Sequence, residues 1–410
     1  MKSAVNLRVV LTILIFIAVT AGTVGSCYVK GKKQHDFEIY YSASLAYREG
    51  LDPYQTENLS KALGKPVDTP FVYPPDALFV FRPLTFFDYQ TAARIFLTLK
   101  LLAVGVLIFF WDRIFNFKQY LPAFLLVAPL AFNGTILDDL SCGNVSVLEQ
   151  FFIWIGFYFY ARDKIAWFAA AIVLASTCKF TPILLLAVLL TRWRRRDFIC
   201  LGYAGISFLL ILALNRLIWP QMFSEFFQNV NSIHGETNYG AMNPAILPLA
   251  THAVAWLTIK TGYLVPGFFA TGFYIGTSFI VIIFGALTFV KLMPLADKRA
   301  DLWRICLMCF VYALILPRLK NYSYIVLIAP IFYAIISRPL AKAWVPFCGL
   351  LVIYTYGVPN VLGNALAPFF TIQRDYYCLI IAWVIAGLFC YSFWRKPQSA
   401  SGESASLSLD

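Results

Sequence analysis

Charged residues are scarce in this chain of 410 residues. Only 13% of the sequence is Asp, Glu, Lys or Arg, and there are three histidines. A soluble domain carries about 25% charged residues, so the composition excludes a water-soluble enzyme. The sequence also lacks a Gly-rich phosphate loop, a Ser-His-Asp arrangement and paired Cys-x-x-Cys spacings. We therefore expect no metal site and no cofactor.

Hydrophobic residues are abundant instead, at 60% of the chain, and aromatic residues make up 17%. One membrane crossing takes about 20 apolar residues, so the chain can supply about ten. The sequence predicts an all-α polytopic membrane protein with about ten transmembrane helices. The long apolar runs lie near residues 8–29, 90–111, 120–137, 144–161, 197–218, 266–290, 302–317, 321–337, 343–357 and 376–394.

The net charge of +12 comes from Lys and Arg in short segments beside these apolar runs. Positive charge is retained on the cytoplasmic side of membranes, which explains the basic balance better than a nucleic-acid partner does. The run from Val9 to Val29 has no convincing signal-cleavage site and is followed by many more runs. We expect a multi-pass protein of the plasma (inner) membrane with both termini in the cytoplasm.

Two segments do not fit a simple crossing. Residues 165–191 have basic clusters at both ends, so they must enter and leave on one side. Pro182 disfavours a continuous helix, which predicts a re-entrant hairpin of two half-helices that meet at Lys179. The segment from Tyr73 to Phe87 contains Arg82 and is too short to cross. We expect it to form interfacial helices at the outer surface.

The chain thus forms one integral membrane domain, residues 1–396, followed by a Ser-rich tail, residues 397–410, that we expect to be disordered in the cytoplasm. The first outer loop, residues 30–89, is the most informative segment. Asp36 and Glu38 lie there beside Tyr40 and Tyr41. Carboxylates suit general-base chemistry on a hydroxyl group, and aromatic faces suit sugar rings. The alternative is a solvated interfacial loop with tyrosines at the membrane boundary.

Cations form a second set of candidates. Lys179 lies within an apolar segment, where a charge suggests function; it could bind a lipid phosphate or extend to the interface. Arg318 and Lys320 are expected on the outer face, where they could bind an anionic substrate or the phosphates of the bilayer. Asp138 and Asp139 could hold a divalent cation, although capping of the next helix by Ser141 or Asn144 is the simpler reading.

Six motifs occur in chain order: His35-Asp36-Phe37-x-x-Tyr40-Tyr41, Asp52-Pro53-Tyr54, Tyr73-Pro74-Pro75, Gly143-Asn144, Lys179-x-x-Pro182 and Pro317-Arg318-x-x-x-Tyr322. Together they resemble the membrane glycosyltransferases of the GT-C superfamily. Within it the chain looks like glycosyltransferase family 87, similar to polyprenol-phosphate-mannose-dependent mannosyltransferases. The resemblance spans about residues 30 to 340. The chain has Gly143-Asn144 where many relatives have Gly-Gln, and Lys320-Asn321-Tyr322 where mannosyltransferases often have a histidine pair.

The resemblance implies a GT-C-like fold and a hexosyltransferase. Its donor would be a sugar on a polyprenyl phosphate, with mannose as the default, and its acceptor a hydroxyl group of a glycolipid or glycan at the outer face. Asp36 would be the catalytic base of an inverting transfer. The expected substrate-binding residues are Glu38, Tyr40, Tyr41, Tyr73, Asn144, Lys179, Arg318, Lys320 and Tyr322.

The alternative function is a polytopic transporter or a lipid or glycolipid flippase. Transporters commonly show repeat symmetry and paired broken helices, whereas this sequence has one expected break. An enzyme requires Asp36, Lys179 and Arg318 around one outward-facing pocket. A transporter requires a path to the cytoplasm. Apart from sugar donor and acceptor, we expect membrane lipids as partners and no nucleic acid.

Overall fold

A computed structural model describes residues 34–234, 240–294, 298–337, 343–352 and 374–394, together with single residues between 10 and 25. These described residues form helices and no strand. The α-helices and the short 3-10 helices, labelled η, are α2 (His35–Arg48), α3 (Thr56–Leu63), α4 (Ala77–Phe81), η1 (Arg82–Phe86), α5 (Tyr89–Phe115), η2 (Lys118–Tyr120), α6 (Leu121–Cys142), α7 (Ser146–Tyr160), α8 (Ile165–Cys178), η3 (Thr181–Arg192), α9 (Arg195–Ile218), α10 (Pro220–His234), η4 (Gly240–Met242), α11 (Ile246–Thr261), α12 (Phe268–Leu292), α13 (Lys298–Ile315), η5 (Asn321–Tyr324), α14 (Ile325–Ile336), α15 (Trp344–Val352) and α17 (Tyr377–Trp394).

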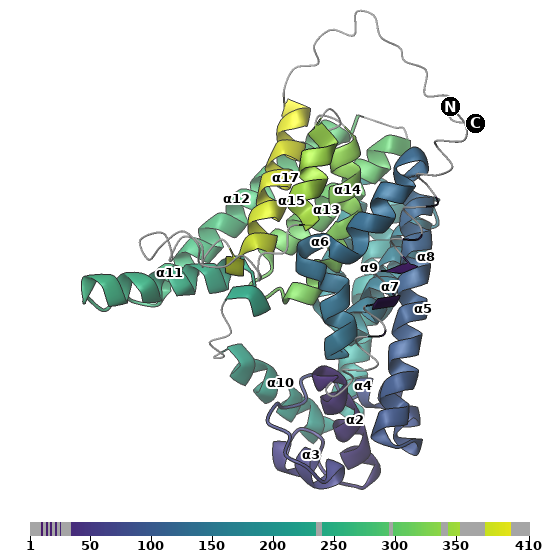
Figure 1. Ribbon diagram of the computed structural model, residues 1–410, viewed down its shortest axis with the longest axis vertical. Helices are drawn as coiled ribbons and strands as arrows, with labels where there is room; N and C mark the ends of the chain where they lie inside the picture. Colours follow the sequence, from purple (N-terminus) through teal and green to yellow (C-terminus); the bar gives the residue numbers. More distant parts are fainter. Residues whose placement is uncertain are drawn as a thin grey trace, which may run out of the picture.

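The helices divide into a bundle and a smaller group at one end of it (Figure 1). The bundle is built around α14, whose side chains from Ile325 to Phe332 are almost completely buried. The smaller group contains α2, α3, α4 and α10, with its own apolar core. In that core, Phe37 of α2 packs against Phe96 of α5, with ring centroids 4.7 Å apart. The candidate site lies where this group meets the bundle.

Five described helices are long and apolar enough to cross a membrane: Tyr89–Phe115, Lys118–Cys142, Arg195–Ile218, Phe268–Leu292 and Tyr377–Trp394. All five coincide with expected crossings. Other expected crossings contain shorter helices, such as α7 with 15 residues. The expected first helix at 8–29 and the tail at 397–410 lie almost entirely outside the described residues. The total of ten crossings stays a prediction.

The long helix α6 is interrupted in its middle. It contains Pro129, and residues Ala131 to Gly134 leave the helical conformation; Phe132 and Asn133 have φ values of 53° and 60°. Proline removes a backbone donor and clashes with the preceding turn, whereas this interruption follows Pro129, so the proline alone does not account for it. The positive φ angles of two non-glycine residues indicate local backbone strain.

The helices α8 and η3 form a hairpin, and the helical conformation is interrupted at Lys179, as expected. α8 ends at Cys178, Lys179 is extended with φ −146° and ψ 138°, and η3 begins at Thr181. The 14 residues of α8 measure about 21 Å at 1.5 Å per residue. This length is shorter than the roughly 30 Å hydrocarbon core of a bilayer.

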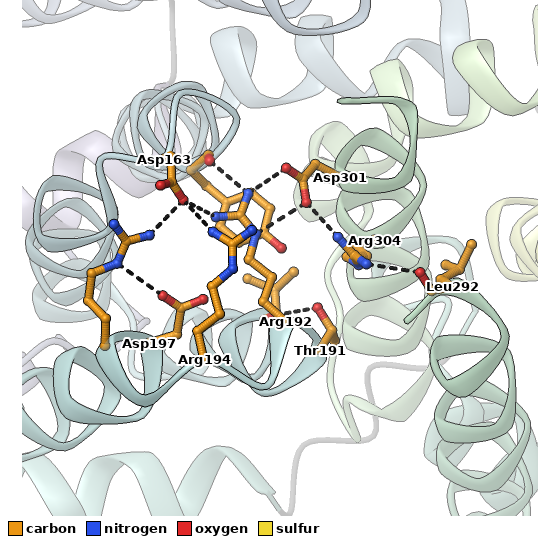
Figure 2. Close-up of polar contacts among 11 residues, drawn as sticks. Asp163, Thr191, Arg192, Arg194, Asp197, Leu292, Asp301 and Arg304 are labelled. Atoms are coloured by element: carbon orange, nitrogen blue, oxygen red, sulfur yellow. Dashed lines mark hydrogen bonds and ion pairs between the residues drawn. The ribbon is translucent and has the colours of Figure 1, made fainter. Parts of the chain in front are cut away.

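The two ends of this hairpin are joined by arginine–aspartate contacts (Figure 2). The guanidinium of Arg192, at the end of η3, donates to Asp163 at 2.9 Å, just before α8 begins. It also forms a bidentate pair with Asp301 of α13, at 2.6 and 3.2 Å. Arg194 and Arg196 donate to the same Asp163 oxygen at 3.1 and 2.7 Å. We call this set the arginine clamp; it fixes the base of the hairpin to the bundle.

Replacing Arg192 by Met should destabilise the protein. Its side chain is only 3% exposed. Asp163 and Asp301 keep other arginine partners, so the loss is that of hydrogen bonds between charged groups, about 1.5–3 kcal/mol. The matched control is Arg194→Met, which removes a cation from the same Asp163 oxygen but at a side chain 55% exposed. An exposed pair contributes about 0–1 kcal/mol. Thermal unfolding in detergent micelles compares the two, and equal losses would refute the clamp.

Candidate active site

Helix α2 selects which residues of the first loop face the rest of the site. Side chains four residues apart lie on one face of a helix, so Asp36 and Tyr40 point in the same direction. Glu38 lies about 200° around the helix from Asp36 at 100° per residue. It pairs instead with Lys65 at 2.5 Å. Tyr41 donates to the carbonyl oxygen of Phe87 at 2.8 Å.

The side-chain amide of Asn144 connects the two halves of the site. Its Nδ2 donates to Oδ2 of Asp36 at 2.6 Å and to the hydroxyl of Tyr40 at 3.1 Å. Its Oδ1 accepts from the backbone N–H and the hydroxyl of Ser146, at 3.0 and 2.9 Å, and lies 3.4 Å from Nζ of Lys179. A carboxylate and an ammonium group thus contact opposite ends of one buried amide. The N-cap position of α7 is Val145, so Asn144 binds the Ser146 N–H from one residue before the expected capping position.

Lys179 lies at the tip of the α8–η3 hairpin. Its ammonium donates to Oγ of Ser146 at 2.5 Å and pairs with Glu149 of α7 at 3.0 Å. It lies 5.3 Å from the ring centroid of Tyr322, close enough for a cation–π contact. Ser146 and Glu149 were not predicted. In the sequence, Glu149 is an acidic residue inside an apolar run, and this position alone could have indicated a functional role.

Two tyrosines extend the site on the side of Asp36. The hydroxyl groups of Tyr40 and Tyr73 lie 2.9 Å apart, and their rings are nearly perpendicular, with centroids 5.0 Å apart. Burial raises the pKa of Tyr73 to about 12. Burial, with Tyr73 and Asp36 nearby, also raises the pKa of Tyr40 well above its ordinary value. Both hydroxyls therefore stay protonated near neutral pH and act as hydrogen-bonding groups rather than bases.

Arg318 and Lys320 were predicted to bind an anionic group. They lie between α13 and η5, and both are half-buried. The next residue, Asn321, donates to Oδ2 of Asp138 at 2.5 Å. Tyr322 contacts Lys179, so this segment runs beside the site. The roles of Arg318 and Lys320 in binding an anion stay predictions.

The carboxylates of Asp138 and Asp139 face separate partners. Asp138 accepts from Asn321, whereas Asp139 pairs with Lys100 at 2.7 Å. Among the described residues, no group of three His, Cys, Asp or Glu side chains is placed to hold a metal ion. The charged side chains that hydrogen bonds and ion pairs connect to Asn144 and to one another are those of Asp36, Lys179 and Glu149.

A small, largely apolar cavity adjoins the site. Lys179 follows directly after one of its lining residues, Cys178, and Tyr73 contributes to both the cavity and the site. Such a cavity suits the apolar part of a ligand whose polar group lies at Lys179. The lining residues are Tyr73, Asp76, Ala77, Val80, Phe81, Val145, Leu148, Thr177 and Cys178.

A family model described as glycosyltransferase family 87 matches residues 71–317, which is more than half of the chain. The match includes Tyr73, Asn144 and Lys179 and begins after Asp36. No curated protein and no solved structure shows significant similarity to the chain.

The turn before Asn144 should not tolerate a side chain at Gly143. Gly143 has φ +71°, and a Cβ atom there would lie 2.8 Å from the Cβ atoms of both Gln34 and Phe37. The matched control is Gly64, which also has φ +71° but no atom within 4 Å of such a Cβ. We expect Gly64→Ala to cost about 1–2 kcal/mol from backbone conformation alone.

Gly143→Ala should add about 1–3 kcal/mol from steric overlap, because α2 must move away from the turn. Thermal unfolding of the two variants measures the difference. Equal destabilisation would mean that the close approach of α2 to this turn is wrong.

Proposed function

Because this chain belongs to glycosyltransferase family 87, we propose that it transfers a hexose, with mannose as the default, from a polyprenyl-phosphate donor to a hydroxyl group of a glycolipid or glycan. The observation that carries this proposal is the Asn144 amide, which contacts the Asp36 carboxylate and the Lys179 ammonium at its two ends. A base and a cation held this close suit the attacking and leaving groups of one displacement.

The proposed reaction is a single displacement at the anomeric carbon. Asp36 accepts the proton of the acceptor hydroxyl as its oxygen forms a bond to the anomeric carbon. The bond from that carbon to the phosphate oxygen breaks, and the electron pair leaves with the polyprenyl phosphate. One attack from the face opposite the leaving group inverts the anomeric configuration. Asn144, which donates to Asp36, keeps the carboxylate oriented.

Lys179 would stabilise the negative charge that develops on the leaving phosphate. Its present partner is Glu149, whose side chain is 3% exposed. We propose that the donor phosphate approaches Lys179 from the side of Tyr322 and the adjoining cavity, while Glu149 holds the ammonium in place. The apolar cavity would accept the first part of the prenyl chain.

The proposed site faces the outer side of the plasma (inner) membrane. The arginine clamp carries the basic cluster that the positive-inside rule assigns to the cytoplasm, and Lys179 lies at the opposite end of the hairpin. This arrangement supports a re-entrant hairpin within a GT-C-like bundle of about ten crossings with both termini inside. The exposed side chains of Val80 and Phe86, at 63% and 74%, support interfacial helices for α4 and η1.

The transporter or flippase alternative is less well supported. Family membership favours transfer chemistry, and the carboxylate and the ammonium meet at one site. A transporter would not require that pairing.

Asp36→Asn should abolish transfer because the amide cannot accept the proton. General-base catalysis contributes about 10²- to 10⁴-fold, so turnover should fall by that factor while membrane insertion and folding stay normal. The assay follows transfer of labelled sugar from polyprenyl-phosphate-mannose to membrane acceptors. Glu57→Gln removes an exposed carboxylate of the same loop and should leave turnover unchanged. A wild-type rate for Asp36→Asn would exclude Asp36 as the base, and Glu38→Gln would then be tested for that role.

Removing the ammonium at position 179 should weaken donor binding. Lys179→Met alone leaves Glu149 buried and unpaired, so the informative variant is Lys179→Met/Glu149→Gln, and its control is Glu149→Gln. We expect the double variant to raise the KM for the donor by about 10- to 100-fold, because a charge-assisted hydrogen bond contributes about 1.5–3 kcal/mol. The control should keep donor affinity, and equal KM values for the two variants would remove Lys179 from the phosphate site.

A further inference from the structure

A second carboxylate–ammonium pair lies next to the site, and the proposed reaction does not use it. Nζ of Lys100, on α5, lies 2.7 Å from Oδ1 of Asp139, on α6, and both side chains are 0% exposed. Burying two charges among apolar helices carries a large desolvation cost. Replacing such a pair by hydrophobic residues is often neutral or stabilising, so the presence of the pair points to a role other than stability.

Both members of the pair act on the turn that carries Asn144. The same Lys100 ammonium donates to the backbone carbonyl oxygen of Asp139 at 2.5 Å. That oxygen also accepts the N–H groups of Gly143 and Asn144, at 3.0 and 3.2 Å. One carbonyl therefore receives a charged donor from α5 and two backbone donors from the turn. The side chain of Asn144 then contacts Asp36 at 2.6 Å.

We propose that Lys100 and Asp139 are positioning residues that hold the Gly143–Asn144 turn and thereby orient the Asn144 amide beneath the Asp36 carboxylate. The Asp139 carboxylate holds the Lys100 ammonium, and the ammonium fixes the carbonyl on which the turn closes. Neither residue contacts the reacting atoms. The effect on turnover rests on the proposed role of Asp36 as the base, whereas the effect on the turn does not.

A merely structural ion pair would behave differently when replaced as a unit. Removing one partner leaves a buried, unpaired charge and is strongly destabilising, whereas replacing both by apolar residues is often neutral or stabilising. The double variant Lys100→Met/Asp139→Leu should therefore fold, even if Lys100→Met does not. It removes the donor to the Asp139 carbonyl but preserves the packing of the two helices.

The experiment compares this double variant with the wild type and with Arg94→Met, which removes an exposed cation from the same helix. Thermal unfolding first shows that each protein is folded. Hydrogen exchange by mass spectrometry then follows the peptide that contains residues 140–146, and steady-state transfer from polyprenyl-phosphate-mannose gives kcat and KM.

For the double variant we expect faster exchange at Gly143 and Asn144. We also expect kcat to fall at least about tenfold, since misplacement of a catalytic group by about 1 Å can cost as much as 10²-fold, with the donor KM within about twofold of wild type. Arg94→Met should match the wild type in both measurements. Unchanged exchange, or a wild-type kcat in the folded double variant, would overturn the proposal. If the wild type itself does not use the polyprenyl-phosphate donor, the proposed function fails, and the exchange measurement alone decides on the positioning role.

Discussion

The site depends on the orientation of one amide, that of Asn144. Its nitrogen faces Asp36 and Tyr40, and its oxygen faces Lys179 and Ser146. A flipped amide would direct its oxygen at a carboxylate and its NH₂ group at an ammonium, so every neighbour favours the same orientation. The amide thus lies between a carboxylate and an ammonium group and forms a hydrogen bond with each. The Asn144 amide joins three segments of the chain, because Asp36 and Tyr40, Ser146, and Lys179 each form a hydrogen bond with it.

Four polar residues of the site lie where a helix begins or breaks. Asp36 is in the first turn of α2, Asn144 lies between α6 and α7, Lys179 lies between α8 and η3, and Tyr322 is in the short η5. Unpaired backbone groups in a membrane are tolerated only where protein or water surrounds them. Helix ends and breaks that meet in this way create such a polar region where the smaller helix group joins the apolar bundle, and the rest of each bundle helix remains free to face lipid.

The sequence predicts where helices are interrupted, but it does not predict which side chains contact each other across neighbouring helices. The basic clusters beside residues 165–191 and Pro182 predicted the break at Lys179, and the five longest apolar helices fall on expected crossings. Glu38 was grouped with Asp36 because both lie in one loop, but the helical period turns it toward Lys65. Lys100 and Asp139 could not be paired from the sequence, since that contact depends on how α5 packs against α6. Periodicity within a helix is encoded locally, whereas the neighbour across a helix interface is not.

Several buried cations of the bundle are paired with carboxylates, because an unpaired charge is costly in apolar surroundings. Lys100 pairs with Asp139, Lys179 with Glu149, and Arg192 with Asp301. A lone charge would be expelled from apolar surroundings or neutralised. Of these three ammonium or guanidinium groups, Lys179 has the greatest side-chain exposure, 22% against 0% and 3%. It is the paired cation that an incoming anion can still reach, because Lys100 is closed off by α5 and α6, and Arg192 is enclosed at the base of the hairpin. The break in the hairpin at Lys179, rather than the presence of charge, therefore distinguishes the partly exposed cation from the two enclosed ones.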